Sequence, residues 1–254
     1  MSRLPEFDLG TLDVAQESIY EGIVSGPRGK FGGPFYALIH APEIADATQA
    51  LGAVLRFNTK LDPRYRETAI LVAARFWLNA VEWDAHVPIA INVDVPIECI
   101  EGILEQKMPD SVASEYQLVI RFCQELLEEK QVSDAVYFET RELVGLEQVV
   151  ELVSVIGYFG LLAMQLNIFQ ISPDPRDGKP PAHLMFPASG RSQKLDSGGC
   201  CGNQSVFLME FSIKVGDVSP GVNNSTRARK PPVSTNLHET HFHFQSRYPC
   251  AKIR

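Results

Sequence analysis

Apolar residues recur every three or four positions through most of residues 42–171, which is the period of amphipathic helices. The pattern predicts helices over about 42–57, 64–80, 82–91, 96–106, 111–130, 133–144 and 146–171. Asp62-Pro63 and Ser133 supply starts for two of them, since these residue types favour the first positions of a helix. No alternating strand pattern competes here, so we expect an all-α fold.

The chain up to about Ala41 is rich in glycine and proline and is expected to form loops. A phosphate-binding loop is one interpretation of the run Gly26-Pro27-Arg28-Gly29-Lys30-Phe31-Gly32-Gly33-Pro34-Phe35. However, its spacing fits neither nucleotide-binding fingerprint, and no predicted strand precedes it. We therefore expect a turn that docks Phe31 and Phe35 on the core.

The pattern changes near Ser172, where the helical periodicity stops. Residues 173–254 hold 11 Lys and Arg against 6 Asp and Glu, whereas residues 1–172 hold 12 against 25. Pro-Pro pairs and a Gly-Gly-Cys-Cys-Gly run accompany this shift of charge. We predict a helical domain over 1–172 and an irregular or disordered tail over 173–254, in which only residues 206–215 look able to form a strand or a short helix.

Charge and hydropathy bound the partners of the protein. The formal net charge of −8 argues against nucleic acid. The longest apolar stretch, about 149–171, is interrupted by Glu151, Gln165 and Asn167, so we expect a core helix and no membrane span. Residues 1–12 show no basic segment followed by an apolar one, so no secretory signal is expected.

The five cysteines form no C-x-x-C pair and no spacing typical of a zinc site. An odd number of cysteines without a signal peptide predicts reduced thiols in a cytoplasmic protein. Cys99 and Cys123 stand in apolar helical contexts and are expected to be packed and inert. The histidines of His238-Glu239-Thr240-His241-Phe242-His243 lack the H-E-x-x-H spacing, so no metal site is expected there.

Three ionisable residues, Glu67, Glu82 and His86, stand among positions that are predicted to be buried. Burying such groups is costly unless they are paired. Glu82 and His86 are four residues apart, so on a helix they share one face. A carboxylate beside a histidine orients the ring and favours the imidazolium, which makes the pair a candidate acid/base device.

Several motifs resemble the carboxymuconolactone decarboxylase-like family, which also includes the AhpD-type peroxidases. The resemblance covers about residues 19–170 and rests on Gly33-Pro34-Phe35-Tyr36-Ala37-Leu38-Ile39-His40-Ala41-Pro42-Glu43, Arg64-Tyr65-Arg66-Glu67, Glu82-Trp83-Asp84-Ala85-His86, Glu151-Leu152 and Gly157-Tyr158. It implies an all-α, AhpD-like fold with a central helical hairpin. It also implies assembly as a homo-trimer or hexamer.

The two branches of this family differ in chemistry. The peroxidase branch uses a C-x-x-C pair whose second thiol lies four residues before a histidine, but here Asn79 and Glu82 occupy those positions. Because peroxidase chemistry needs an attacking and a resolving thiol, we do not expect it. The decarboxylase branch resembles this chain in its Glu-x-x-x-His, and those enzymes release CO2 from an unsaturated lactone acid without metal or organic cofactor.

We therefore hypothesise a cofactor-independent decarboxylase that acts on a small carboxylated lactone or aromatic-derived acid. His86 is the expected general acid/base, Glu82 orients it, and Glu67 relays a second proton or only bonds backbone or a neighbouring arginine. The candidate substrate-binding residues are Arg66, Arg75, Trp83 and Tyr158, although packing is the default interpretation of the two aromatic ones. The alternatives are an isomerase or dehydratase of a biosynthetic pathway, or a non-catalytic oligomeric binding protein of the same fold.

Overall fold

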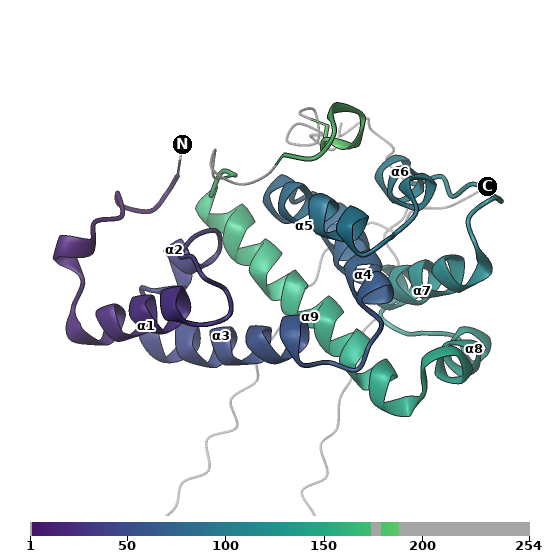
Figure 1. The fold of residues 1–254 in the computed structure, drawn as a ribbon, viewed down its shortest axis with the longest axis horizontal. Coiled ribbons are helices and arrows are strands. Elements are labelled where there is room, and N and C mark those ends of the chain that lie inside the picture. Colours follow the sequence, from purple (N-terminus) through teal and green to yellow (C-terminus); the bar gives the residue numbers. More distant parts are fainter. Residues whose placement is uncertain (1, 174–178, 188–254) are drawn as a thin grey trace, which may run out of the picture. The chain divides into compact units, whose positions relative to one another are not determined.

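The structure is a computed structural model that describes residues 2–173 and 179–187 (Figure 1). These residues form helices and contain no strand, which confirms the predicted all-α fold. The helices are α1 (Val14–Ser25), α2 (Phe35–Leu38), α3 (Pro42–Phe57), α4 (Pro63–Phe76), α5 (Ala80–Asn92), α6 (Ile97–Glu105), α7 (Ser114–Gln124), α8 (Asp134–Val144) and α9 (Leu146–Phe169). Single turns lie at Leu9–Thr11 and Ala182–Leu184, and a π-helical turn at Glu125–Glu129 extends α7.

The N-terminal segment differs from the prediction, because α1 occupies a region that was expected to be loop. Only Ile19 and Ile23 of this helix are buried, so its sequence shows little of the apolar stripe that marks a helix. A reciprocal capping box between Asp13 and Gln16 begins α1. The glycine-rich turn behaves as predicted, since it docks Phe31 and Phe35 in the core.

The centre of the helical domain is α4, which packs against α5, α7 and α9 (Figure 1). Every residue from Glu67 to Ala74 is buried, so this helix has no solvent face in its middle. The chain reverses after α4 through Leu78, which has a left-handed φ of 51°, and continues antiparallel into α5. Together α4 and α5 form the predicted central hairpin, and the two helices place their side chains against each other.

The long helix α9 crosses this hairpin and holds the loop that leads into α4 (Figure 1). The Glu151 carboxylate accepts hydrogen bonds from the backbone N–H groups of Lys60 and Leu61, at 2.8–3.1 Å. Among the described helices, α9 alone is long and apolar enough to cross a membrane, and 56% of its most apolar window is buried inside the domain. That burial agrees with the predicted core helix.

Part of the predicted tail packs on the helical domain. Leu184 is fully buried, and its carbonyl oxygen accepts a hydrogen bond from the Trp83 ring N–H at 2.7 Å. Phe186 meets the Trp83 ring edge-on at 5.9 Å between centroids. The predicted element at 206–215 and the histidines at 238–243 lie outside the described residues.

Candidate functional site

A short hydrogen bond joins the two helices of the central hairpin. The Nδ1 atom of His86 on α5 lies 2.7 Å from Oε2 of Glu67 on α4, and both side chains are buried. The other carboxylate oxygen of Glu67 accepts a hydrogen bond from Nε of Arg66 at 3.2 Å. Burial alone would raise the pKa of Glu67, but His86 and Arg66 outweigh it, so the pKa lies below its ordinary value.

This contact fixes the chemistry of the imidazole. An ionised carboxylate can only accept a hydrogen bond, so Nδ1 of His86 must carry the proton that Glu67 receives. In the neutral ring Nε2 is then the free acceptor, and in the imidazolium it is a donor. The ring of Phe159 meets that of His86 edge-on at 4.9 Å between centroids and holds its orientation. One fixed nitrogen and one available nitrogen are the geometry of a general acid/base.

Glu82 faces the available nitrogen. Its Oε2 atom lies 3.7 Å from Nε2 of His86, which is too long for a hydrogen bond. Asn79 sets this position, since its side-chain oxygen accepts from the Glu82 backbone N–H at 2.9 Å and caps α5. Burial raises the pKa of Glu82, although His86, Arg56 and Arg28 act in the opposite direction. The site therefore holds one carboxylate that favours ionisation and one that resists it.

The roles predicted for the two glutamates are corrected by this geometry. Sequence spacing assigned Glu82 to orient His86, because residues four apart share a helix face. The structure gives that role to Glu67, which reaches the ring across the hairpin. The interhelical contact could not be seen in the spacing, which carries no information on how α4 and α5 pack.

A cavity of about 350 Å³ lies beside the imidazole. Glu82, His86 and Tyr158 line it, as do apolar side chains of α5 and α9 and the glycine-rich turn at residues 30–34. Arg28, Lys30 and Arg56 also line the cavity, and sequence reasoning did not identify them as site residues. The glycine-rich run was the available signal, because such turns let the backbone approach a ligand closely.

Arg28 and Tyr158 contact each other at the cavity wall. Nη2 of Arg28 donates to the Tyr158 hydroxyl at 3.4 Å, and burial is the main cause of the raised pKa of this tyrosine. A Cβ atom built on Gly52 of α3 would lie 2.1 Å from the Tyr158 hydroxyl oxygen and 2.9 Å from Arg28 Nη2. The glycine at 52 therefore makes room for this pair at the cavity wall. Tyr158 lines the cavity, which is the second of its two interpretations from the sequence, the default being packing.

The other candidate substrate-binding residues lie elsewhere. Arg66 contacts Glu67 behind the imidazole and does not line the cavity. Trp83 is fully buried against Leu184 and Phe186, so its role is packing. Arg75 points into a different pocket, where it bonds the Leu104 carbonyl at 2.9 Å. Of these candidates, neither arginine lines the cavity beside His86, and Trp83 follows its default interpretation as a packing residue.

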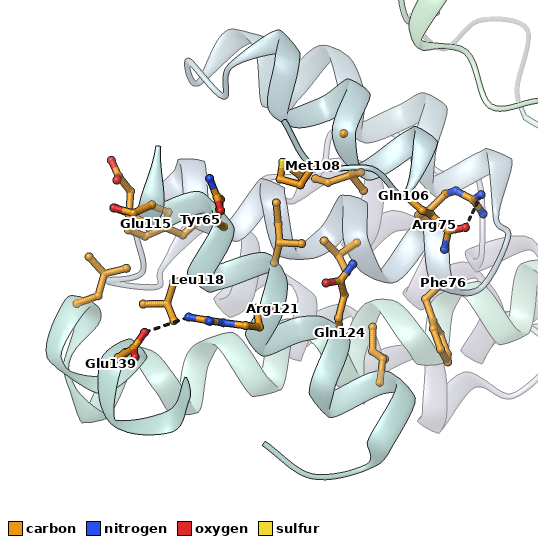
Figure 2. A pocket seen from close by; sticks show the side chains of 18 of the residues that line it. Tyr65, Arg75, Phe76, Gln106, Met108, Glu115, Leu118, Arg121, Gln124 and Glu139 are labelled. Atoms are coloured by element: carbon orange, nitrogen blue, oxygen red, sulfur yellow. Dashed lines mark hydrogen bonds and ion pairs between the residues drawn. The ribbon is translucent and has the colours of Figure 1, made fainter. Parts of the chain in front are cut away.

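The pocket that holds Arg75 is larger, about 850 Å³, and lies among α4, α6, α7 and α8 (Figure 2). Figure 2 shows two hydrogen-bonded pairs among its lining residues, Arg75 with Gln106 and Arg121 with Glu139. Both members of the second pair are more than half exposed. No histidine among the described residues lines this pocket, whereas His86 lines the smaller cavity together with Glu82.

The described cysteines lie outside the site. Cys99 and Cys123 are buried, and burial raises the pKa of Cys99 to about 12 and that of Cys123 as well. High thiol pKa values leave little thiolate at neutral pH, which confirms the expected inert thiols. Within residues 2–173 and 179–187, no group of three or more His, Cys, Asp or Glu side chains is arranged to hold a metal ion.

The opposite pKa directions of the glutamates predict opposite effects on stability. Glu67→Gln should lower the free energy of unfolding at pH 7 by about 1.5–3 kcal/mol, the usual worth of a hydrogen bond to a charged group. Since the pKa of Glu67 is lowered on folding, this loss should shrink as the pH falls below about 4. Urea unfolding of wild type and variant at several pH values measures both quantities.

Glu82→Gln is the matched control. The pKa of Glu82 is raised on folding, so its contribution is complete at acid pH and is lost as the pH rises through the folded value. The uncharged glutamine should therefore leave the protein at least as stable as wild type at pH 7. A Glu82→Gln variant that loses more stability than Glu67→Gln would contradict the described geometry.

Comparison with known proteins supports the fold. No protein-family model and no curated protein matches the chain. Among solved structures, the chain is similar to the "alkylhydroperoxidase AhpD core" of an uncharacterized peroxidase-related protein from Ralstonia eutropha JMP134. The TM-score is 0.58 at 18% sequence identity, and the match covers 75% of this chain and 97% of that one. The helical domain therefore has an AhpD-like fold.

Proposed function

We propose that the protein is a cofactor-independent lyase that decarboxylates a small carboxylated lactone or aromatic-derived acid by general acid/base catalysis. One observation carries this proposal: Glu67 holds Nδ1 of His86, while His86 and Glu82 both line a cavity and Glu82 lies 3.7 Å from Nε2. The cavity also favours an enzyme over the non-catalytic alternative, in which Trp83 and its neighbours would fill the site. Trp83 packs elsewhere and leaves the cavity open.

The reaction that fits these groups needs no external redox partner. The bond between the substrate carbon and its carboxylate breaks, CO2 leaves, and the electron pair moves into a conjugated carbonyl to give an enolate. A proton from Nε2–H of His86 is then added to carbon, and solvent or the Glu82 carboxyl restores it. Because burial raises the pKa of Glu82, this carboxyl holds its proton closer to neutral pH than an ordinary glutamate does.

An isomerase or dehydratase would use the same residues, since both reactions move a proton beside a carbonyl group. Only decarboxylation releases CO2, so the product distinguishes the two classes. A thiol peroxidase stays disfavoured, because Asn79 caps α5 and Glu82 faces the cavity at the positions where the resemblance would place thiols.

The catalytic assignment predicts a graded loss of activity. Full-length protein incubated with a panel of unsaturated lactone acids should release CO2, and His86→Asn should lower kcat by roughly 10²–10⁴-fold, the usual contribution of general acid/base catalysis. Glu67→Gln should also lower kcat, since it removes the group that orients the imidazole. Arg121→Gln, an exposed change in the other pocket, is the control and should retain wild-type turnover.

The pH profile of kcat separates a proton donor from a structural residue. Deprotonation of Glu82 at high pH should lower the rate, and Glu82→Gln should lack that limb of the profile. Undiminished turnover in His86→Asn would refute the assignment. Formation of an isomer without CO2 from the same acids would replace the lyase by the alternative enzyme class.

We also propose that the protein is a homo-oligomer, a trimer or a hexamer. A stripe of apolar residues on α9 supports this, since each is 37–60% exposed and they follow one face of the helix: Leu146, Val150, Val153, Leu161, Met164 and Ile168. A continuous exposed apolar stripe is typical of a surface that another chain covers. A second copy of this chain is the occupant we propose.

The stripe predicts the effect of charge on assembly. The double substitution Val150→Glu and Met164→Glu should reduce the particle mass measured by light scattering to that of a monomer, because burying two carboxylates in an apolar contact is costly. Val14→Glu, at a residue 84% exposed on α1, is the control and should keep the wild-type mass. A wild-type protein that is monomeric at micromolar concentration would contradict the proposal.

A further inference from the structure

We propose that Arg28 and Arg56, together with the Tyr158 hydroxyl, form the subsite that binds the carboxylate of an organic acid. This inference rests on the proposed function and adds the residues that select the substrate. The two arginines are not among the acid/base residues, and they were not among the substrate-binding residues predicted from the sequence.

The two arginines reach one cavity from separate parts of the fold. Arg28 belongs to the turn after α1, and Arg56 to the last turn of α3. Both line the cavity that holds His86 and Glu82. A carboxylate bound there would therefore lie in the same cavity as the proton-transfer groups.

Neither guanidinium has an acidic partner among the described residues. Arg28 has one hydrogen-bond partner there, the neutral Tyr158 hydroxyl, and its Cζ atom lies 4.6 Å from the centroid of the Phe35 ring. The Arg56 guanidinium has a ring contact with Phe57, at 5.2 Å, and no hydrogen bond or ion pair with another described residue. Half-buried arginines usually pair with a carboxylate. Arg28 and Arg56 are half-buried and have no such partner among the described residues, so their remaining N–H groups are available to an anion.

The electrostatics of the cavity favour an anion as well. Burial is the main cause of the lowered pKa of Arg56, and the charge of Arg28 lowers it further. The nearby carboxylates offset this in part, but Glu67 is engaged by His86 and Arg66, and Glu82 resists ionisation. A bound carboxylate would relieve the repulsion between the two guanidinium groups. This local excess of positive charge occurs in a chain of net charge −8.

The lining of the cavity favours an organic acid over a free inorganic anion. Val81, Ile89, Phe159 and Leu162 supply apolar surface in the same space as the arginines. A planar carboxylate matches the fork of a guanidinium, and an attached ring matches the apolar wall. A free phosphate would interact with the arginines only and would leave the apolar side chains of the cavity exposed to water.

Binding of an unreactive acid tests the subsite without relying on turnover. The probe is 5-oxotetrahydrofuran-2-carboxylic acid, a saturated lactone acid with no conjugated carbonyl to accept electrons, and its methyl ester is the neutral match. By calorimetry on the full chain, Arg56→Gln and Arg28→Gln should each weaken binding of the acid by roughly ten- to a hundredfold and leave the ester unchanged. Arg121→Gln should not alter either affinity.

Folding of the variants is checked at the same time. Removing one of two like charges should leave the melting temperature unchanged or higher, and Arg56→Lys should bind the acid with intermediate affinity because it keeps the charge and loses the fork. Wild-type affinity for the acid in both glutamine variants would overturn the subsite. Arginine-dependent binding of inorganic phosphate that is tighter than binding of the acid would also overturn it. Acid binding without CO2 release from any substrate would leave the subsite in place and refute only the lyase.

Discussion

The hydrogen bond between Glu67 and His86 is the contact on which the site depends. It joins α4, whose residues from Glu67 to Ala74 are all buried, to α5, and places two ionisable groups in a region where neither would be stable alone. Arg66 completes the charge balance behind it. Because Nδ1 is committed to this contact, Nε2 is the nitrogen left for proton transfer in a ring that lines the cavity. Position and protonation of the imidazole thus follow from the packing of one helical hairpin.

The other charged residues of the site lie in two different environments. Glu82 sits at the start of α5, fixed by the Asn79 cap, where burial keeps it from ionising readily. Arg28 and Arg56 lie at the cavity wall with no acidic partner among the described residues. An AhpD-like fold that holds these groups in place of a thiol pair is suited to move protons and bind anions. Glu82 and His86 are buried where they line the cavity, and such low-dielectric surroundings strengthen the action of charged groups.

Local patterns predicted the helices well, and long-range contacts decided what was missed. Asp62-Pro63 and Ser133 begin helices as expected, and Glu67, Glu82 and His86 come together as their unusual burial indicated. The partner of His86 was misassigned because spacing along one helix reveals neighbours on that helix only. Arg28 and Arg56 were missed for the same reason: they reach the cavity from a turn and a helix end that no periodic pattern links to α5. The helix α1 was missed because it buries only two apolar side chains.

The most direct test of the central contact is the protonation pattern of the His86 ring, measured by two-bond ¹H–¹⁵N correlation on protein labelled at histidine, with His86→Asn used to assign the signal. In the neutral form of the ring we predict a protonated Nδ1 and a bare Nε2, and loss of this pattern in Glu67→Gln. A neutral ring with its proton on Nε2, or a pattern unaffected by Glu67→Gln, would contradict it.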